Sequence, residues 1–211
     1  MSGAAYQPSM LDFTPDEPSL GPLAGQLRRH PLDRGAWVDH LPGWVLGSDQ
    51  VLDTLLTEVP WRAERRTMYD AEVDVPRLLC WYAARRPLPH PVLTAARAAL
   101  TAHYTPELGE PLVTAGMCLY RDGRDSVAWH GDTQGRSAHT DTIVAIVSFG
   151  SPRPLLLRPR GGTASLRFPL GHGDLVVMGG TCQRTWEHAI PKTVRPVGPR
   201  VSVQFRPAGV A

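Results

Sequence analysis

The sequence has 211 residues, a hydrophobic fraction of 42% and a formal net charge of +2, values that fit one compact domain with accessory elements. Its apolar runs stay below the roughly 20 residues that a membrane-spanning helix needs, and its three widely spaced cysteines form no disulfide framework. We therefore expect a protein with no membrane contact, and the cytoplasm as its default compartment. The mildly basic charge is too small to indicate nucleic-acid binding by itself.

Residues 1–45 are predicted to be an N-terminal leader that is partly irregular, because the stretch up to residue 27 mixes Pro and Gly with acidic residues and has no Lys or Arg. A short helix is predicted in GSDQVLDTLLTEVPW, where apolar residues recur at helical spacing between Ser48 and Pro60. The Ala-rich run HPVLTAARAALTAHY, with Pro91 at its start, favours a second helix.

Between these helices, WRAERRTMYDAEVDVPRLLCWYAARRP mixes arginine with aromatic residues. Stacking rings among cations are typical of a surface that binds single-stranded nucleic acid. From Pro111 onward the pattern changes to short β-branched runs interrupted by Gly and Pro, namely LVTAGMCLY, SVAW, TIVAIVSFG, PLLLRP, ASLRFPL, DLVVMGG, WEHAI and RVSVQFR. Repeated short strands favour a sandwich or barrel over a parallel α/β sheet. The predicted class is mainly β within α+β.

The pattern His-x-Asp occurs three times, starting at His130, His139 and His172, where chance predicts roughly half of one copy. On a strand, residues i and i+2 share a face, so the pattern presents an imidazole beside a carboxylate. Non-haem Fe(II) oxygenases add a second His and leave positions open for cosubstrate and oxygen. His188, in the predicted strand WEHAI, is the best candidate for that second His.

The other two copies are predicted to have structural roles. His139-Thr140-Asp141 ends a polar loop ahead of the next strand. His172-Gly173-Asp174 lies only 14 residues before His188, which leaves too little chain for the intervening strands. Its flanking glycines indicate a turn, which Asp174 is expected to support.

The run RVSVQFR alternates apolar and polar residues. As a strand it would bury the valines and the phenylalanine on one face and present Arg200 and Arg206 on the other. Two guanidinium groups on an inner face need anionic partners. Arg is suited to binding carboxylates through two hydrogen bonds, so a dicarboxylate and Asp132 are suitable partners.

The run LYRDGRDSVAWHGD, followed by IVSFG, GDLVVMGG, QRTWEHAIPK and RVSVQFR, resembles the AlkB family of Fe(II)- and 2-oxoglutarate-dependent dioxygenases over residues 112–206. The resemblance implies a double-stranded β-helix, or jelly roll, over residues 111–208, and a nucleotide-recognition lid among the helices of residues 46–110. It also implies Fe(II), the cosubstrate 2-oxoglutarate and molecular oxygen. The implied activity is oxidative demethylation of alkylated bases in DNA or RNA, most simply in DNA repair.

Position by position, the resemblance implies iron ligation by His130, Asp132 and His188. Arg200 would bind the distal carboxylate of 2-oxoglutarate, and Arg206 would lie near the metal end. The remaining positions of the implied cosubstrate site are Tyr120, Cys118 and Ser202. Cys118 stands where the family usually has Asn, and Ser202 where some members have another Asn, so both amide groups are missing here.

For the substrate, the resemblance places Gln134 where relatives have an acidic residue near the base. Further candidates to contact the base are Arg77, Trp61, Met68, Trp81 and Tyr82. A monomer is expected. Two alternatives remain open: a dioxygenase of the same fold that acts on a protein side chain or small molecule, and a non-catalytic jelly roll that binds nucleic acid.

Overall fold

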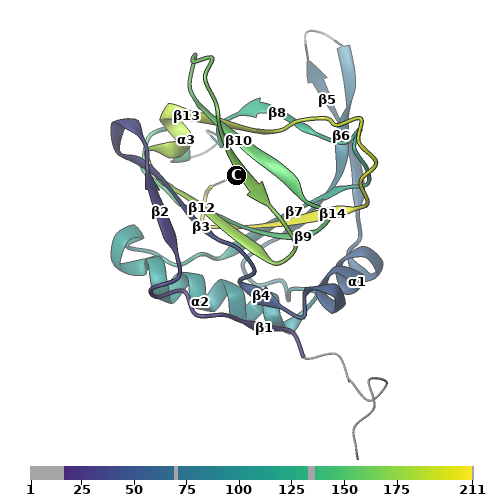
Figure 1. Ribbon diagram of the computed structural model, residues 1–211, viewed down its shortest axis with the longest axis horizontal. Helices are drawn as coiled ribbons and strands as arrows, with labels where there is room; N and C mark the ends of the chain where they lie inside the picture. Colours follow the sequence, from purple (N-terminus) through teal and green to yellow (C-terminus); the bar gives the residue numbers. More distant parts are fainter. Residues whose placement is uncertain (1–16, 69–70, 133–135, 211) are drawn as a thin grey trace, which may run out of the picture.

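Two facing antiparallel sheets make up the body of the computed structural model, which describes residues 17–68, 71–132 and 136–210 (Figure 1). The larger sheet contains, in spatial order, β2 (Arg28–Pro31), β3 (Ala36–Leu41), β12 (Asp174–Gly180), β9 (Val144–Gly150), β14 (Arg200–Arg206), β7 (Thr114–Tyr120), β6 (Ala71–Tyr82) and β5 (Arg62–Met68). The smaller sheet contains β11 (Leu166–Leu170), β10 (Arg153–Pro159), β13 (Trp186–Ile190) and β8 (Val127–His130). The short strands β1 (Ser19–Leu20) and β4 (Val45–Leu46) pair separately.

The two long helices cover the outer face of the larger sheet (Figure 1). The α-helices are α1 (Ser48–Glu58), α2 (Pro91–Leu108) and the short α3 (Cys182–Thr185), and the 3-10 turns are η1 (Asp33–Gly35) and η2 (Arg136–Ala138). Helix α2 begins where His90 Nδ1 accepts a hydrogen bond from the Val92 amide at 3.2 Å, with proline at the first helical position. It ends at Gly109, whose φ of 76° is the left-handed conformation that glycine adopts easily. The two long helices start and end close to the predicted limits.

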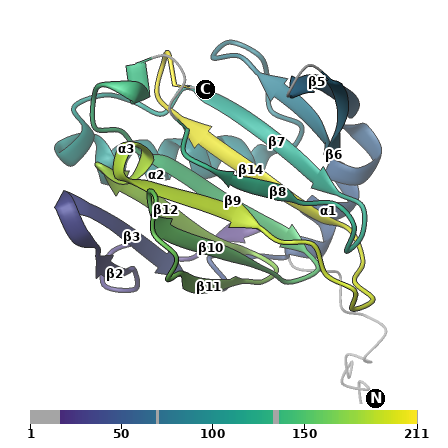
Figure 2. The same cartoon turned by 90° about the horizontal axis from the view of Figure 1, so that it is seen from above.

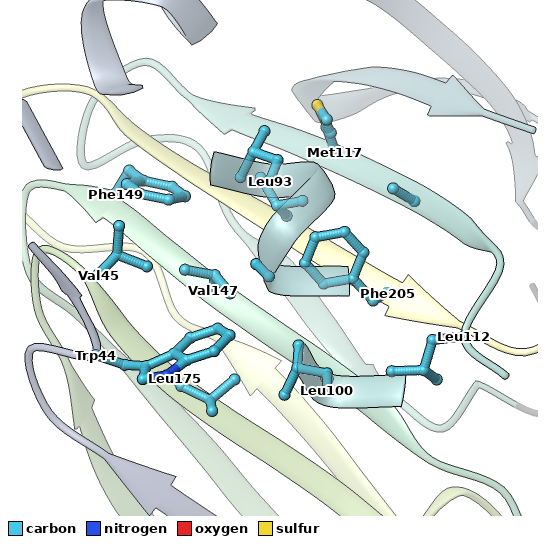
Figure 3. Close-up of a cluster of buried hydrophobic side chains, with 14 of the residues drawn as sticks. Trp44, Val45, Leu93, Leu100, Leu112, Met117, Val147, Phe149, Leu175 and Phe205 are labelled. Atoms are coloured by element: carbon cyan, nitrogen blue, oxygen red, sulfur yellow. The ribbon is translucent and has the colours of Figure 1, made fainter. Parts of the chain in front are cut away.

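Strand β9 shows how the sequence builds two cores. Its buried residues alternate: Val147 and Phe149 face the helices, whereas Val144 and Ile146 face the smaller sheet. Figure 3 shows Leu93 of α2 among the side chains of the helix-side core. A strand buried on both faces reads as a continuous apolar run, which is why TIVAIVSFG is so hydrophobic. The mainly β jelly-roll prediction is confirmed.

The N-terminal part of the described chain is more regular than the sequence predicted. Strands β2 and β3 belong to the larger sheet, where β3 pairs with β12, although residues 1–45 were assigned to a partly irregular leader. The sequence pattern did not predict β3 because this strand contains the buried, charged Asp39. The Asp39 carboxylate accepts hydrogen bonds from Arg29 Nε at 2.8 Å and from the Tyr104 hydroxyl at 2.9 Å. Between α1 and α2, in the stretch where a nucleotide-recognition lid was expected, β5 and β6 form a hairpin that extends the same sheet (Figure 2).

No helix within the described ranges is both long and apolar enough to cross a membrane.

Candidate metal centre and cosubstrate pocket

Three predicted ligands meet at one edge of the smaller sheet. Strand β8 ends at His130, which is directly opposite His188 on β13, and Asp132 follows two residues later. The potential ligand atoms of the three side chains all lie within 4.8 Å of one another. Two imidazoles and a carboxylate on one side of a metal are the facial arrangement that non-haem Fe(II) uses.

Neighbouring groups orient these side chains. His130 Nδ1 lies 2.9 Å from the Ala128 carbonyl oxygen, so Nε2 faces Asp132 Oδ1 at 3.6 Å. The Asp132 backbone amide donates to Gln183 Oε1 at 3.1 Å, and Arg206 Nη2 donates to Asp132 Oδ2 at 3.0 Å. Contacts of this kind fix the orientation of metal ligands.

The protonation states of Asp132 and His188 are also suited to binding a metal ion. Burial alone would raise the pKa of Asp132, but Arg206 and the two imidazoles outweigh it and hold the pKa at about 2. Burial, and after it the neighbouring His130, lowers the pKa of His188 to about 3. A carboxylate and a neutral imidazole are therefore available near neutral pH, which is the protonation state that metal binding needs.

A cavity of about 490 Å³ extends from this group between the sheets, with Arg200 in its wall. Arg200 is 1% exposed, and its Nε donates to Ser148 Oγ at 3.0 Å. Its Nη1 is buried with no hydrogen-bond partner among the described residues. Burial lowers the pKa of this guanidinium. Because a buried, incompletely paired cation is costly, this end of the cavity fits one carboxylate of a dicarboxylate ligand.

Tyr120 lies beside that cation, with the Arg200 guanidinium 5.2 Å from its ring centroid. Burial raises the pKa of Tyr120 to about 12, so its hydroxyl stays protonated and can donate a hydrogen bond. Across the strand pair, Cys118 is opposite Ser202. Both line the cavity, as does Arg206. The structure thus brings all the predicted cosubstrate residues to one cavity.

The predicted substrate residues separate into three groups. Arg77 and Trp81 line the cavity, and Trp81 is 45% exposed. The expectation for Tyr82 and Trp61 is corrected: Tyr82 points from the opposite face of β6 into the helix-side core, and Trp61 packs against that core with its indole N–H donating to the Leu55 carbonyl at 3.0 Å. Gln134 and the side chain of Met68 lie outside the described part of the chain.

The other two His-x-Asp copies bind protein groups. His139 is exposed, and Asp141 pairs with Arg184. Asp174 accepts hydrogen bonds from the Gly171 amide at 2.6 Å and the Gly43 amide at 2.8 Å, which is the turn support that the sequence predicted.

Pattern analysis missed several residues of the site. Gln183 contacts the backbone of Asp132, and Ser148 contacts Arg200. Gln204 lines the cavity and touches Arg206. For Gln204 a signal existed, because it alternates in register with the two arginines of RVSVQFR. Neither Gln183 nor Ser148 has a comparable signal, since their partners are distant in sequence.

A sequence model described as the 2OG-Fe(II) oxygenase superfamily matches residues 45–206. The chain belongs to this superfamily. Members of this superfamily use Fe(II), 2-oxoglutarate and molecular oxygen, and the cavity fits the first two: it has three side chains that could hold a metal ion at one end and a buried, partly unpaired Arg200 in its wall.

Curated relatives confirm the resemblance to AlkB proteins. The chain is 30% identical to human alpha-ketoglutarate-dependent dioxygenase alkB homolog 3 and 29% identical to the mouse protein, each over 187 residues. These alignments cover 78% of this chain, which spans 64% of the length of either relative. Human DNA oxidative demethylase ALKBH2 is 33% identical over 95 residues, 41% of this chain and 36% of that protein.

Solved structures agree on the fold. The structure of OsALKBH1 matches with a TM-score of 0.55 and 14% identity, over 85% of this chain and 100% of that one. A 2OG-Fe(II) oxygenase family oxidoreductase from Burkholderia pseudomallei matches with a TM-score of 0.54 and 14% identity, over 82% of this chain and 87% of that one. At these identities the likeness supports the jelly-roll fold alone.

Proposed function

We propose that this oxygenase is an oxidative demethylase of alkylated nucleic-acid bases and serves in DNA repair. The observation that carries the proposal is that one cavity joins the metal-binding group to the exposed hairpin residues Trp81 and Arg62. A ligand that reaches the metal would therefore pass an aromatic ring and a cation, which suits a base and a phosphate. The similarity to human DNA oxidative demethylase ALKBH2 supports the same substrate class.

The protein's contribution to this reaction is binding, orientation and exclusion of water. Bound iron, with 2-oxoglutarate and molecular oxygen as cosubstrates, would supply the oxidising chemistry that converts the methyl group to formaldehyde. His130, Asp132 and His188 would hold the metal, while Arg200 and Tyr120 would hold the distal carboxylate of the cosubstrate. Apolar side chains that line the same cavity keep water away from the reacting centre; they are Val127, Ile146, Leu155, Leu170 and Ile190.

The substrate base must leave its stack, because a methyl group inside a duplex is out of reach of a cavity between two sheets. Trp81 offers a stacking surface at the mouth, and the exposed Arg62 and Arg86 lie at the same opening. A single strand would enter at a lower cost than a duplex. Since one chain supplies every cavity residue named above, the proposal needs no partner subunit and includes action as a monomer.

The proposal is tested with methylated oligonucleotides, as single and double strands of DNA and RNA, in the presence of Fe(II), ascorbate and 2-oxoglutarate. We expect formaldehyde, succinate and loss of the methyl mass, fastest with a single strand. His188→Ala should abolish all three products, and the unmethylated oligonucleotide is the matched substrate control. Turnover of a peptide or metabolite, together with no turnover of any methylated nucleic acid, would contradict the proposal and favour the alternative oxygenase.

A further inference from the structure

Gln204 of β14 lies in the middle of the cavity wall. Its side chain is on the same face of the strand as Arg200, four residues before it, and Arg206, two residues after it. Across the strand pair, Gly116 of β7 is opposite Gln204. Gln204 therefore stands between the arginine that holds the metal-binding carboxylate and the arginine that awaits an anion.

The carboxamide of Gln204 connects three polar side chains. Its Nε2 donates to Ser202 Oγ at 2.6 Å and to Cys118 Sγ at 3.4 Å. Its Oε1 accepts from Arg206 Nη1 at 3.5 Å. The amide thus joins the two strands that form the cavity wall and links them to the guanidinium that binds Asp132.

Gly116 makes space for this arrangement. A Cβ atom at this position would lie 2.8 Å from Arg206 Nη1, 3.1 Å from Gln204 Oε1 and 3.4 Å from the Trp81 ring. Any larger residue would push the Gln204 and Arg206 side chains away from their present positions. The close approach of both side chains to the β7 backbone is therefore specific to a glycine at 116.

We propose that Gln204 is a positioning residue for 2-oxoglutarate. Its side chain supplies from β14 the amide group that Cys118 on β7 cannot supply. The amide of Gln204 holds the Cys118 thiol and the Ser202 hydroxyl in place in the cavity wall. It also fixes the Arg206 guanidinium against Asp132. The inference rests on the cosubstrate of the superfamily, not on the proposed nucleic-acid substrate, so the two can fail independently.

A neutral amide suits this position better than a charged group. Arg206 Nε is buried with no hydrogen-bond partner among the described residues, so its guanidinium depends on Asp132 and Gln204 for its orientation. A carboxylate at 204 would compete with Asp132 for Arg206. It would also place a negative charge beside a dicarboxylate ligand, which is unfavourable in a low-dielectric cavity. An amide both donates and accepts without either cost.

The test measures 2-oxoglutarate binding calorimetrically on the full chain, loaded with Fe(II) under anaerobic conditions, so that no turnover is involved. Gln204→Leu should raise the Kd for 2-oxoglutarate about tenfold, equivalent to about 1.4 kcal/mol, with a smaller change in Fe(II) affinity because Arg206 keeps its direct contact with Asp132. Gln204→Glu, which keeps the shape but not the donor, should raise it further. Gln50→Leu on α1, away from the cavity, is the matched control and should bind as the wild type does.

A rescue experiment distinguishes a positioning role of Gln204 from a role in packing alone. Cys118→Asn in the Gln204→Leu background returns an amide to the register partner of Ser202 and should recover at least threefold of the lost affinity, while the thermal midpoint of the two variants stays similar. The inference is overturned if Gln204→Glu binds 2-oxoglutarate like the wild type, or if Cys118→Asn recovers no affinity in a folded double variant. Either result can occur with nucleic-acid demethylation intact, which distinguishes it from failure of the proposed function.

Discussion

The tripeptide His-Gly-Asp occurs at 130–132 and again at 172–174, and the two copies have different surroundings. In the first, His130 and Asp132 converge on His188. In the second, His172 Nδ1 accepts from the Gly150 amide at 2.7 Å and Asp174 accepts from two other backbone amides. The same three letters thus form part of a candidate metal centre in one place and a turn in the other. The difference is that His188 lies opposite His130, whereas His172 and Asp174 contact backbone amides.

The central glycines show the same contrast. Gly173 has a φ of +81°, and a Cβ there would lie 2.4 Å from the Val45 carbonyl oxygen. Gly131 has no such left-handed backbone in the structure, but a Cβ there would lie 2.4 Å from the Gln183 carbonyl oxygen. One glycine is needed for turn geometry and the other for close packing beside the metal-binding group.

The largest expected effect separates the two histidines. His130→Ala removes a metal ligand and should lower turnover at least about 100-fold, since even the loss of residues that only support metal ligands costs 10- to 100-fold. His172→Ala should keep Fe(II) affinity and most of the turnover. The measurements are Fe(II) titration and succinate formation on both variants. Equal losses in the two would remove the distinction drawn between the copies.

Arg200→Met tests the far end of the cavity. A charged hydrogen bond contributes about 1.5–3 kcal/mol, so losing the guanidinium should raise the KM for 2-oxoglutarate roughly 10- to 100-fold. The KM for nucleic acid should change little. Arg62→Met at the mouth is the matched control and should show the reverse pattern. An unchanged requirement for 2-oxoglutarate in Arg200→Met would reject the assigned role.

The pH dependence of stability tests how deeply the metal-binding group is buried. The unfolded chain protonates an imidazole near pH 6.5, whereas folded, metal-free protein protonates His188 only near pH 3. Between these values the unfolded state binds more protons, so the free energy of unfolding should fall as the pH is lowered, with a slope of up to about 1.4 kcal/mol per pH unit. Chemical denaturation of the metal-free wild type and of His188→Gln checks this. A slope that is the same in both would show that His188 is not buried in its neutral form.

Gly173→Ala is expected to act on stability alone. Alanine in the left-handed conformation, close to a carbonyl oxygen, should cost about 1–3 kcal/mol, seen as a lower thermal midpoint. Affinity for Fe(II) per folded molecule should be unchanged. Gly131→Ala, its counterpart, should instead weaken Fe(II) binding. If both substitutions weakened metal binding equally, the second copy would have a role in the site that the contacts do not suggest.

Residue patterns in the sequence predict some parts of this structure and not others. The alternation in RVSVQFR predicted which face of β14 lines the cavity, and the order of the motifs predicted the group of His130, Asp132 and His188. The buried Asp39 made β3 unlike an apolar strand, because its partners Arg29 and Tyr104 come from other elements. Likewise Tyr82 and Trp81 are adjacent in the sequence, and only strand pairing shows that Trp81 alone faces the cavity.

The central claim is that one cavity couples 2-oxoglutarate oxidation to removal of a methyl group from a base. The most direct measurement follows succinate and formaldehyde in a single reaction with a methylated single-stranded oligonucleotide. We predict equal amounts of the two products, both abolished in His130→Ala and both retained in His172→Ala. The account would be contradicted if methylated nucleic acid did not stimulate succinate formation and if succinate formed without an equal amount of formaldehyde.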